Sequence, residues 1–489
     1  MKLRKTFIYI LIGALSLASC SENRLIENPV DQFPLEDPLR SESDMRYLLN
    51  GVYDQYSTAA GFGTDILVFG DLISDNVFIT SQNTDVAYRT TGFLNWSADI
   101  SDFGMLDELY DGIVLANAVI NDKSLPETPT VLNYKGEARI ARALGYYYAV
   151  SFYSPNPTSG VNQEYGVPLN LGKYDPNAKL PRASVSEVYD LIISDLTTAL
   201  STMTNETPTD NNGAPNKGFL SPTAARLLLS RIYLTRGATG DYQKALEYSN
   251  QIISSAGTNS FGFVSKSDYV NYFTSSDISV SENRPETIWE INMTSTPSEN
   301  TGVNNSISSF YASNGTKRRF LFRKSFYDSF LSTDVRKGLL TTTPALNEGT
   351  NVPPGVWTRK YIRTTSEGNF TQNVKVFRMS EAYLNKIEAL NKLGNTTQAL
   401  TELNAFATSR GGSIYTSASI ENILTERRKE FFAEGQRFFD LKRNNLGFSN
   451  TTNCYSIVCS VLGNDKLFVI PMPLREMNLN NNMKQYPGW

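Results

Sequence analysis

Apolar residues recur at helical spacing along most of the chain after about residue 40. In residues 40–57, one face of a helix would carry the apolar side chains of Met45, Leu48, Leu49, Val52 and Tyr56. Residues 104–121 and 133–153 show the same periodicity, which predicts two further amphipathic helices. Residues 154–183 are rich in Pro, Gly and Asn, and this composition predicts a loop.

Two helix starts can be predicted from single residues. Ser184 and Glu187 are three residues apart and form a capping-box pattern, in which each side chain bonds the other residue's backbone NH. Ser221 precedes Pro222, and proline is well tolerated at the first helical position because its missing NH would have no helical partner there. Helices are therefore expected to begin at about residues 185 and 222.

Two segments share one plan of helix, turn and helix. Residues 222–255 and 377–409 both have an apolar stripe in the first helix, and Ala245 and Ala399 stand at corresponding points of the second helix. A small alanine there lets two helices pack closely. The pattern resembles tetratricopeptide hairpins, although its consensus is degenerate and the two copies are not in tandem. Such hairpins stack into a solenoid with one continuous core.

Between the hairpins, residues 256–376 show little periodicity and contain many Ser, Thr, Asn and Gly. Residues 286–292 alternate like a strand, residues 317–331 are expected to add a helix, and residues 374–377 lead into the second hairpin. A segment of this length without regular structure is usually functional. The fold class predicted is mostly α. Tetratricopeptide-like helical hairpins (about 40–255 and 374–445) form a scaffold with an inserted loop-rich, strand-containing subdomain (about 256–373), all within one domain, 39–489.

The first residues are interpreted as a targeting signal. Lys2, Arg4 and Lys5 precede an apolar stretch over 7–18, and the sequence Leu-Ala-Ser-Cys at 17–20 resembles the lipobox of bacterial lipoproteins. Residues 1–19 are thus predicted to be a signal peptide, Cys20 the lipidated residue, and 20–38 an extended tether. The alternative is an ordinary secretory signal with an incidental cysteine. Cleavage would remove three of the 45 basic residues and none of the 49 acidic ones, leaving a net charge of −7.

Composition narrows the chemistry. The chain has no histidine, which excludes Ser-His-Asp and Cys-His catalysis and histidine-ligated zinc or haem. The acidic balance gives no electrostatic footprint for nucleic acid. No catalytic residue, cofactor or metal ligand is predicted. Oxygen ligands would suffice to bind calcium, but the D-x-D-x-D-G calcium motif is absent. Cys454 and Cys459 remain, and a short disulfide is favoured over two free thiols because a secreted protein meets an oxidising environment.

Taken in order, the segments resemble the SusD/RagB family of nutrient-binding lipoproteins in the outer membrane of Bacteroidetes. After Cys20, the matching residues are 48–53 (LLNGVY), 109–110 (LY), Ile113, 116–117 (AN), 137–139 (EAR), 142–143 (RA), 146–148 (YYY), 165–169 (YGVPL), 221–234 (SPTAARLLLSRIYL), 426–430 (ERRKE), 434–437 (EGQR), 439–443 (FDLKR), 470–471 (IP), Glu476 and 485–489 (QYPGW). One departure is Phe103, where members often have a tryptophan. The resemblance implies a SusD-like fold with no enzymatic activity.

The charged C-terminal signature invites a catalytic interpretation, but a structural one is favoured. On a helix, Leu424, Phe431 and Phe438 would share a face, and residues three apart could form ion pairs along its surface. The expected pairs are Arg427–Glu430, Glu434–Arg437 and Asp440–Arg443. Gly435 would permit a close approach of two backbones.

Family membership would imply a surface-exposed lipoprotein that captures an oligomeric nutrient, most often a glycan, and delivers it to a TonB-dependent β-barrel transporter. Ligand sites in the family are shallow and consist largely of aromatic rings on loops, and sugar rings stack on such aromatic faces. Trp357, flanked by Pro353–Gly355 and by 358–360, is expected to be exposed, whereas Trp289 is expected to lie in the core. For Trp96, ligand contact and core packing are equally open. The predicted ligand contacts are Trp357, Tyr361, Arg363, Tyr311, Asn314, Trp96 and Asn95.

Two functions from other classes remain open at this stage. A surface glycoside hydrolase would need two carboxylates facing each other across a groove, and 49 acidic residues could supply such a pair. A helical-repeat scaffold would bind only protein. Neither the nature of the ligand (starch, another glycan or a peptide) nor a bound calcium ion can be read from the sequence.

Overall fold

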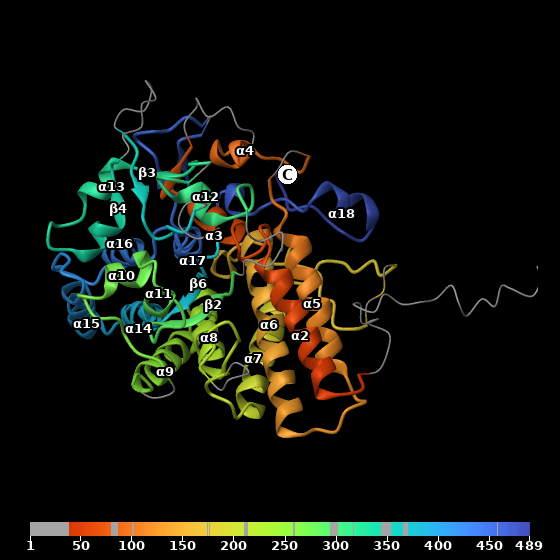
Figure 1. Cartoon of the computed structure of the whole chain (residues 1–489). Helices are drawn as coiled ribbons and strands as arrows, with labels where there is room; N and C mark the ends of the chain where they lie inside the picture. Colours follow the sequence, from red (N-terminus) through yellow and green to blue (C-terminus); the bar gives the residue numbers. More distant parts are fainter. Residues whose placement is uncertain are drawn as a thin grey trace, which may run out of the picture.

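A row of neighbouring helices forms the scaffold of the molecule (Figure 1). The computed structural model describes residues 39–79, 87–99, 102–173, 175, 177–209, 214–257, 260–293, 302–315, 317–343, 354–364, 370–456 and 458–489. Each helix of the row packs against the next, in the order α2 (Glu42–Ser57), α5 (Met105–Asn121), α6 (Pro129–Tyr153), α7 (Val185–Thr202), α8 (Pro222–Arg236), α9 (Asp241–Ser254), α14 (Met379–Lys392) and α15 (Thr396–Ser409). The mostly α fold class is confirmed.

The predicted helix signals operate as expected. The apolar stripe of α2 is buried, and Ser41 caps this helix by accepting from the backbone NH of Asp44. Ser184 and Glu187 form the complete capping box at the start of α7, and Pro222 occupies the first turn of α8. These local bonds satisfy NH groups that have no partner within a helix.

The two helical hairpins lie side by side although the insertion separates them in sequence, because α9 packs against α14. Ala245 and Ala399 are both fully buried, as the predicted close packing requires. Gly237 ends α8 in the left-handed conformation, with φ of 61°, which is accessible to glycine without steric strain. The predicted pair of hairpins is therefore confirmed.

The insertion consists of short elements resting on this row. They are α10 (Tyr269–Thr274), α11 (Ile278–Ser281), β2 (Thr287–Ile291), α12 (Ile307–Tyr311), β3 (Leu321–Phe322), α13 (Lys324–Asp328), the 3-10 turn η3 (Val335–Leu339), β4 (Leu340–Thr341) and β5 (Trp357–Thr358). The predicted strand is β2, which pairs antiparallel with β6 (Val374–Arg378), and Trp289 is fully buried there as predicted. The helix expected over 317–331 is confined to α13, because residues 321–322 pair with β1 (Val77–Phe78) instead.

The C-terminal part returns to the scaffold. It comprises α16 (Ile420–Phe431), α17 (Arg437–Arg443), β7 (Phe448–Ser449), β8 (Ser460–Val461), η4 (Lys466–Phe468) and α18 (Leu474–Leu479). The helical conformation is interrupted between α16 and α17, where Ala433 and Gly435 have φ of 60° and 70°. The predicted close approach at Gly435 is confirmed, because a Cβ there would lie 2.6 Å from the Cα of Leu67 in α3 (Asp65–Leu72).

The remaining elements are α4 (Arg89–Gly92) and η2 (Pro157–Ser159), the latter the only regular element in the described part of the predicted 154–183 loop. Cys454 and Cys459 form the predicted short disulfide, in the segment between β7 and β8. Among the described residues, no helix has the length and apolar character needed to cross a membrane. The predicted signal peptide, Cys20 and the tether lie outside the described residues.

Candidate functional site

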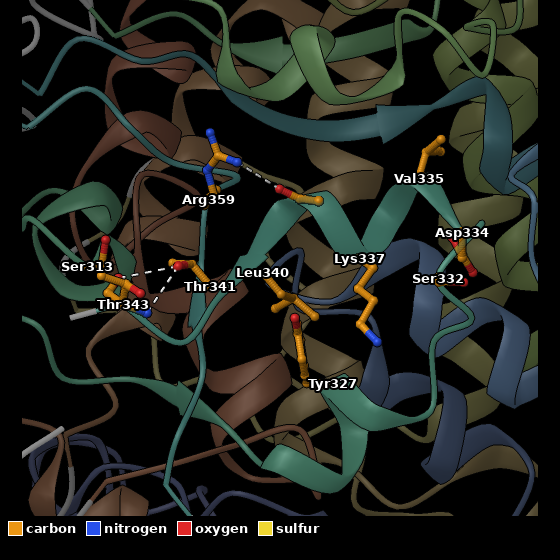
Figure 2. A pocket seen from close by; sticks show the side chains of 11 residues that line it. Ser313, Tyr327, Ser332, Asp334, Val335, Lys337, Leu340, Thr341, Thr343 and Arg359 are labelled. Atoms are coloured by element: carbon orange, nitrogen blue, oxygen red, sulfur yellow. Dashed lines mark hydrogen bonds between the residues drawn. The ribbon is translucent and has the colours of Figure 1, made fainter. Parts of the chain in front are cut away.

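An open pocket of about 740 Å³ lies in the insertion, beside the hairpin of β4 and β5 (Figure 2). Its size is within the range of pockets that bind small ligands. Its lining is mostly polar and combines hydroxyl groups, two cationic side chains and one aromatic ring. The lining residues are Ser313, Tyr327, Ser332, Asp334, Val335, Lys337, Gly338, Leu340, Thr341, Thr343 and Arg359.

Local hydrogen bonds hold one wall of the pocket in place. Asp334 begins η3 by accepting from the backbone NH of Arg336 at 3.0 Å. The Arg336 guanidinium returns to the same carboxylate, with Nε at 2.9 Å from Oδ1 and Nη2 at 2.8 Å from Oδ2. Both side chains are completely buried. Asp334 therefore lines the pocket as a neutralised carboxylate.

Tyr327 and the two cationic side chains define the accessible part of the site. The Lys337 ammonium donates to the carbonyl oxygen of Phe330 at 3.2 Å and lies 4.6 Å from the centre of the Tyr327 ring. Arg359 is exposed and donates from Nη1 to the carbonyl oxygen of Gly338 at 3.0 Å. Hydroxyl groups, an aromatic ring and cationic donors together can bind a polyhydroxylated molecule by stacking and hydrogen bonding.

A buried ion network connects the pocket to the scaffold. Arg336 also donates to Glu426 at 2.7 Å and lies 3.5 Å from Glu430, both on α16. Glu430 in turn contacts Arg378 at 3.0 Å and Arg410 at 3.3 Å. Although burial opposes ionisation, Arg410, Arg378 and Arg336 together hold the pKa of Glu430 well below its usual range. The network fixes the position of η3 relative to α16.

Most of the C-terminal signature belongs to this buried network, which corrects the expected surface pairs. Only Asp440–Arg443 pairs as predicted. Arg427 contacts Asp440, and Arg437 contacts Asp75. The Glu434–Arg437 pair is wrong because the helix breaks at 432–436, which removes the helical spacing. Glu430 pairs instead with arginines from other elements. The signature has the structural role that was expected, but its ion pairs lie in the core and not on a helix surface.

Five of the predicted ligand contacts lie inside the protein, namely Trp357, Tyr361, Tyr311, Arg363 and Trp96. Trp357 and Tyr361 have exposed fractions of 2% and 4%, so the prediction that Trp357 is exposed is wrong. Trp357 packs with Phe78 of β1 and Leu321 of β3, because it lies in the paired strand β5 and not in an open loop. Tyr361 donates to the carbonyl oxygen of Ala433 at 2.8 Å.

Two further predicted residues are held by polar partners within the core. Tyr311 is fully buried and donates to the carboxylate of Asp71 at 3.2 Å. Arg363 is buried and forms an ion pair with Glu282. The structure brings Tyr311 and Tyr361 together, with ring centres 6.0 Å apart, but as core packing.

The last three predicted residues divide between core and surface. Trp96 is buried, and its ring lies edge-on to that of Phe103 with the ring centres 5.4 Å apart. Of the two roles left open for Trp96, core packing and ligand contact, the structure shows core packing. Asn95 and Asn314 are exposed. Asn314 directly follows Ser313 of the pocket lining, so it is the predicted contact that remains nearest in sequence to the site.

Tyr327, Lys337 and Arg359 line the pocket but are not among the contacts predicted from the sequence. Tyr327 stands in a segment where phenylalanines recur (Phe320, Phe322, Phe326 and Phe330), and no local signal separates it from these core rings. The phenylalanines are buried, whereas Tyr327 is only partly so. Arg359 lies two residues after Trp357 in sequence, and strand alternation would place the two on the same face. Alternation therefore does not distinguish the exposed Arg359 from the buried Trp357.

Two family models match separate parts of the chain. One is described as "SusD family" and matches residues 332–489, and the other as "Starch-binding associating with outer membrane" and matches residues 27–234. A curated relative, SusD-like protein P2 of Formosa agariphila, is 24% identical, and the alignment covers 91% of each chain.

Solved structures share the fold. A SusD superfamily protein of Bacteroides vulgatus matches with a TM-score of 0.80 and 24% identity, covering 92% of this chain and 100% of that one. Surface glycan-binding protein A of Bacteroides fluxus matches with a TM-score of 0.74 and 22% identity, covering 92% and 100%. At these identities, the structural similarity establishes the fold.

Proposed function

Because the chain belongs to the SusD/RagB family, we propose that it is a surface-exposed outer-membrane lipoprotein that captures an oligomeric glycan and delivers it to a TonB-dependent transporter. The starch-binding, outer-membrane description of the second family model supports the ligand class and the location. The name of the Bacteroides fluxus protein supports the same ligand class.

The pocket beside β4 and β5 is the observation that carries this proposal. It is open to solvent, as the capture of a segment within a longer chain requires. Four of its lining residues carry aliphatic hydroxyl groups, namely Ser313, Ser332, Thr341 and Thr343. Hydroxyl groups both donate and accept, so they can bind sugar hydroxyls in either sense. Tyr327 provides a ring against which a pyranose could pack.

The chemistry of the pocket favours binding over hydrolysis. A glycoside hydrolase needs one carboxylic acid and one carboxylate on opposite sides of the scissile bond. Among the described residues, the pocket is lined by one carboxyl group, that of Asp334, and both of its oxygens accept from Arg336. Proton transfer from such a group would require breaking a buried ion pair.

Affinity electrophoresis of the purified lipoprotein in detergent, with and without dissolved polysaccharides, tests the ligand class. Retardation without sugar products supports a binding protein, and release of reducing ends would support the hydrolase. If none of a broad panel of neutral and acidic polysaccharides retards the protein, glycan binding is contradicted. Co-purified proteins alone would then favour the scaffold.

The membrane anchor and the transporter need separate experiments. Metabolic labelling with a fatty-acid analogue should mark the wild-type protein but not Cys20→Ala. Protease treatment of intact cells should degrade the wild-type protein if it faces outward. Delivery requires that a β-barrel transporter co-purifies with the lipoprotein and that uptake of the bound glycan fails in its absence.

A further inference from the structure

The pocket of Figure 2 lies in a basic part of an otherwise acidic protein. The described residues between 302 and 364 include ten Lys and Arg but only two Asp and Glu. The whole chain, in contrast, has 45 basic and 49 acidic residues. The excess of positive charge is thus local to residues 302–364, the part of the insertion that contains the pocket.

Neither acidic residue neutralises the cations at the pocket. Asp334 is completely buried and bound by Arg336. Asp328 pairs with Lys324 at 2.7 Å on the exposed side of α13. Both described carboxylates between residues 302 and 364 are therefore already engaged with other cations.

Lys337 and Arg359 have only neutral partners in the described part of the chain. Lys337 contacts a carbonyl oxygen and the Tyr327 ring, and Arg359 contacts a carbonyl oxygen. An ammonium has three donors and a guanidinium five, so both groups keep unused donors at the pocket. Figure 2 shows both side chains among the lining residues.

We propose that the glycan bound in this pocket is anionic and that Lys337 and Arg359 bind its carboxylate or sulfate groups. This inference rests on the proposed glycan binding. Charge-assisted hydrogen bonds from ammonium and guanidinium groups to such oxygens are stronger than neutral ones. The hydroxyls and the Tyr327 ring would bind the sugar itself, so that recognition needs both the anionic group and the sugar ring.

The overall charge of the protein makes this local arrangement informative. With an acidic balance over the whole chain, long-range electrostatics disfavours the approach of a polyanion. Binding of an acidic glycan would therefore depend on the cations at the site. General attraction to a basic surface would not explain it.

The test uses affinity electrophoresis of the full lipoprotein in detergent with polymers that share a backbone. Dextran is compared with dextran sulfate, hydroxyethyl cellulose with carboxymethyl cellulose, and polygalacturonate is added as a natural uronate chain. Polyglutamate serves as a polyanion without sugar. We expect at least one acidic polysaccharide to bind about fivefold or more tightly than its neutral counterpart and than polyglutamate. The sulfate and carboxylate arms then identify the anionic group.

Two variants assign the effect to the pocket. Lys337→Met and Arg359→Gln should each weaken binding of the acidic polymer roughly two- to fivefold, as expected for partly exposed ion pairs, and should weaken binding of a neutral polymer less. Lys123→Met, an exposed lysine in the loop after α5, is the matched control and should have no effect. Circular dichroism and melting temperature confirm that the variants fold.

The outcomes separate this inference from the proposed function. Retardation by neutral polymers that equals or exceeds that by acidic ones overturns the anionic ligand while glycan binding stands. Equal binding of polyglutamate overturns the need for a sugar. An acidic preference that survives in both variants overturns the assigned site. Absence of retardation by any polysaccharide rejects the proposed function itself.

Discussion

Arg378 Nη1 and Glu430 Oε1 lie 3.0 Å apart in the interior, and their side chains have exposed fractions of 1% and 0%. Arg378 ends the strand β6 and immediately precedes α14, while Glu430 is in the last turn of α16. The pair therefore connects the strand that leads into α14 to the end of α16. A buried carboxylate is tolerated here because several arginines surround it.

Glu430→Gln should destabilise the protein by about 3–5 kcal/mol, because the surrounding arginines would keep their charge without a buried counter-charge. Denaturant-induced unfolding monitored by circular dichroism measures this change. Glu421→Gln, at an exposed position of the same helix, should alter stability by less than about 0.5 kcal/mol. Similar small effects of both changes would contradict a structural role of the network.

The dependence of stability on pH should show a maximum at about pH 4–5. Burial raises the pKa of Asp65 and Asp71 to about 7 in the folded protein. These two groups stabilise the folded state below their ordinary pKa, and this stability is lost as the pH rises through 7. Arg443 and Arg427 lower the pKa of Glu388 to about 2 despite its burial. Its contribution is present above the ordinary glutamate pKa and is lost as the pH falls towards 2.

Free energies of unfolding measured from pH 3 to pH 8 test this profile. Asp65→Asn should flatten the decline between about pH 4 and pH 7, because it removes one carboxyl group that in this range is protonated only in the folded state. The acid limb should remain. A profile that rises steadily from pH 5 to pH 8 would show that these carboxyl groups are ionised in the folded protein.

The helical scaffold could be predicted from the sequence because its signals are local. Apolar spacing, the capping box at Ser184 and the proline at 222 each act within a few residues of the helix they define. The ion network could not be predicted in the same way. Glu430 is three residues from Arg427, but its partners are Arg378, Arg410 and Arg336, which the fold brings from other elements. Sequence spacing carries no information on such contacts.

The same limit applies to the candidate site. A tryptophan after Pro-Pro-Gly suggests an exposed loop, yet two residues of strand pairing at β4 and β5 suffice to bury Trp357. Burial of an aromatic ring in a short strand depends on the neighbouring strand, which is distant in sequence. The lack of periodicity that marks residues 256–376 is, in contrast, a local property and can be read from the sequence.

Tyr327→Ala should weaken glycan binding about two- to tenfold, as expected for the loss of one aromatic contact worth about 0.5–1.5 kcal/mol. Affinity electrophoresis with the polysaccharide that binds the wild-type protein measures this. Tyr47→Ala, at an exposed tyrosine of α2, is the matched control and should bind normally. If both variants bind like the wild type, the pocket is not the glycan site.

Trp357→Ala should act on stability instead. Removal of a buried tryptophan from a packed cluster typically costs about 3–5 kcal/mol. Unfolding in denaturant should therefore occur at clearly lower concentration, while any loss of glycan binding should follow the fraction of unfolded protein. Wild-type stability combined with lost affinity would restore Trp357 as a ligand contact.

Replacement of both cysteines, Cys454→Ser with Cys459→Ser, should lower stability by about 2 kcal/mol, because the disulfide closes a short loop and limits the freedom of the unfolded chain. The loop precedes β8 and follows Thr452 and Asn453, whose carbonyl oxygens accept from Arg323 at 3.0 Å and 3.5 Å. Arg323 also donates to the carbonyl oxygen of Asp75, so the bridge helps to hold this loop against residues near β1. Denaturant unfolding with and without a thiol reductant provides the measurement. The reductant should destabilise the wild-type protein and leave the double variant unchanged; an equal response of the two proteins would mean that the reductant acts elsewhere and that the bridge does not stabilise the fold.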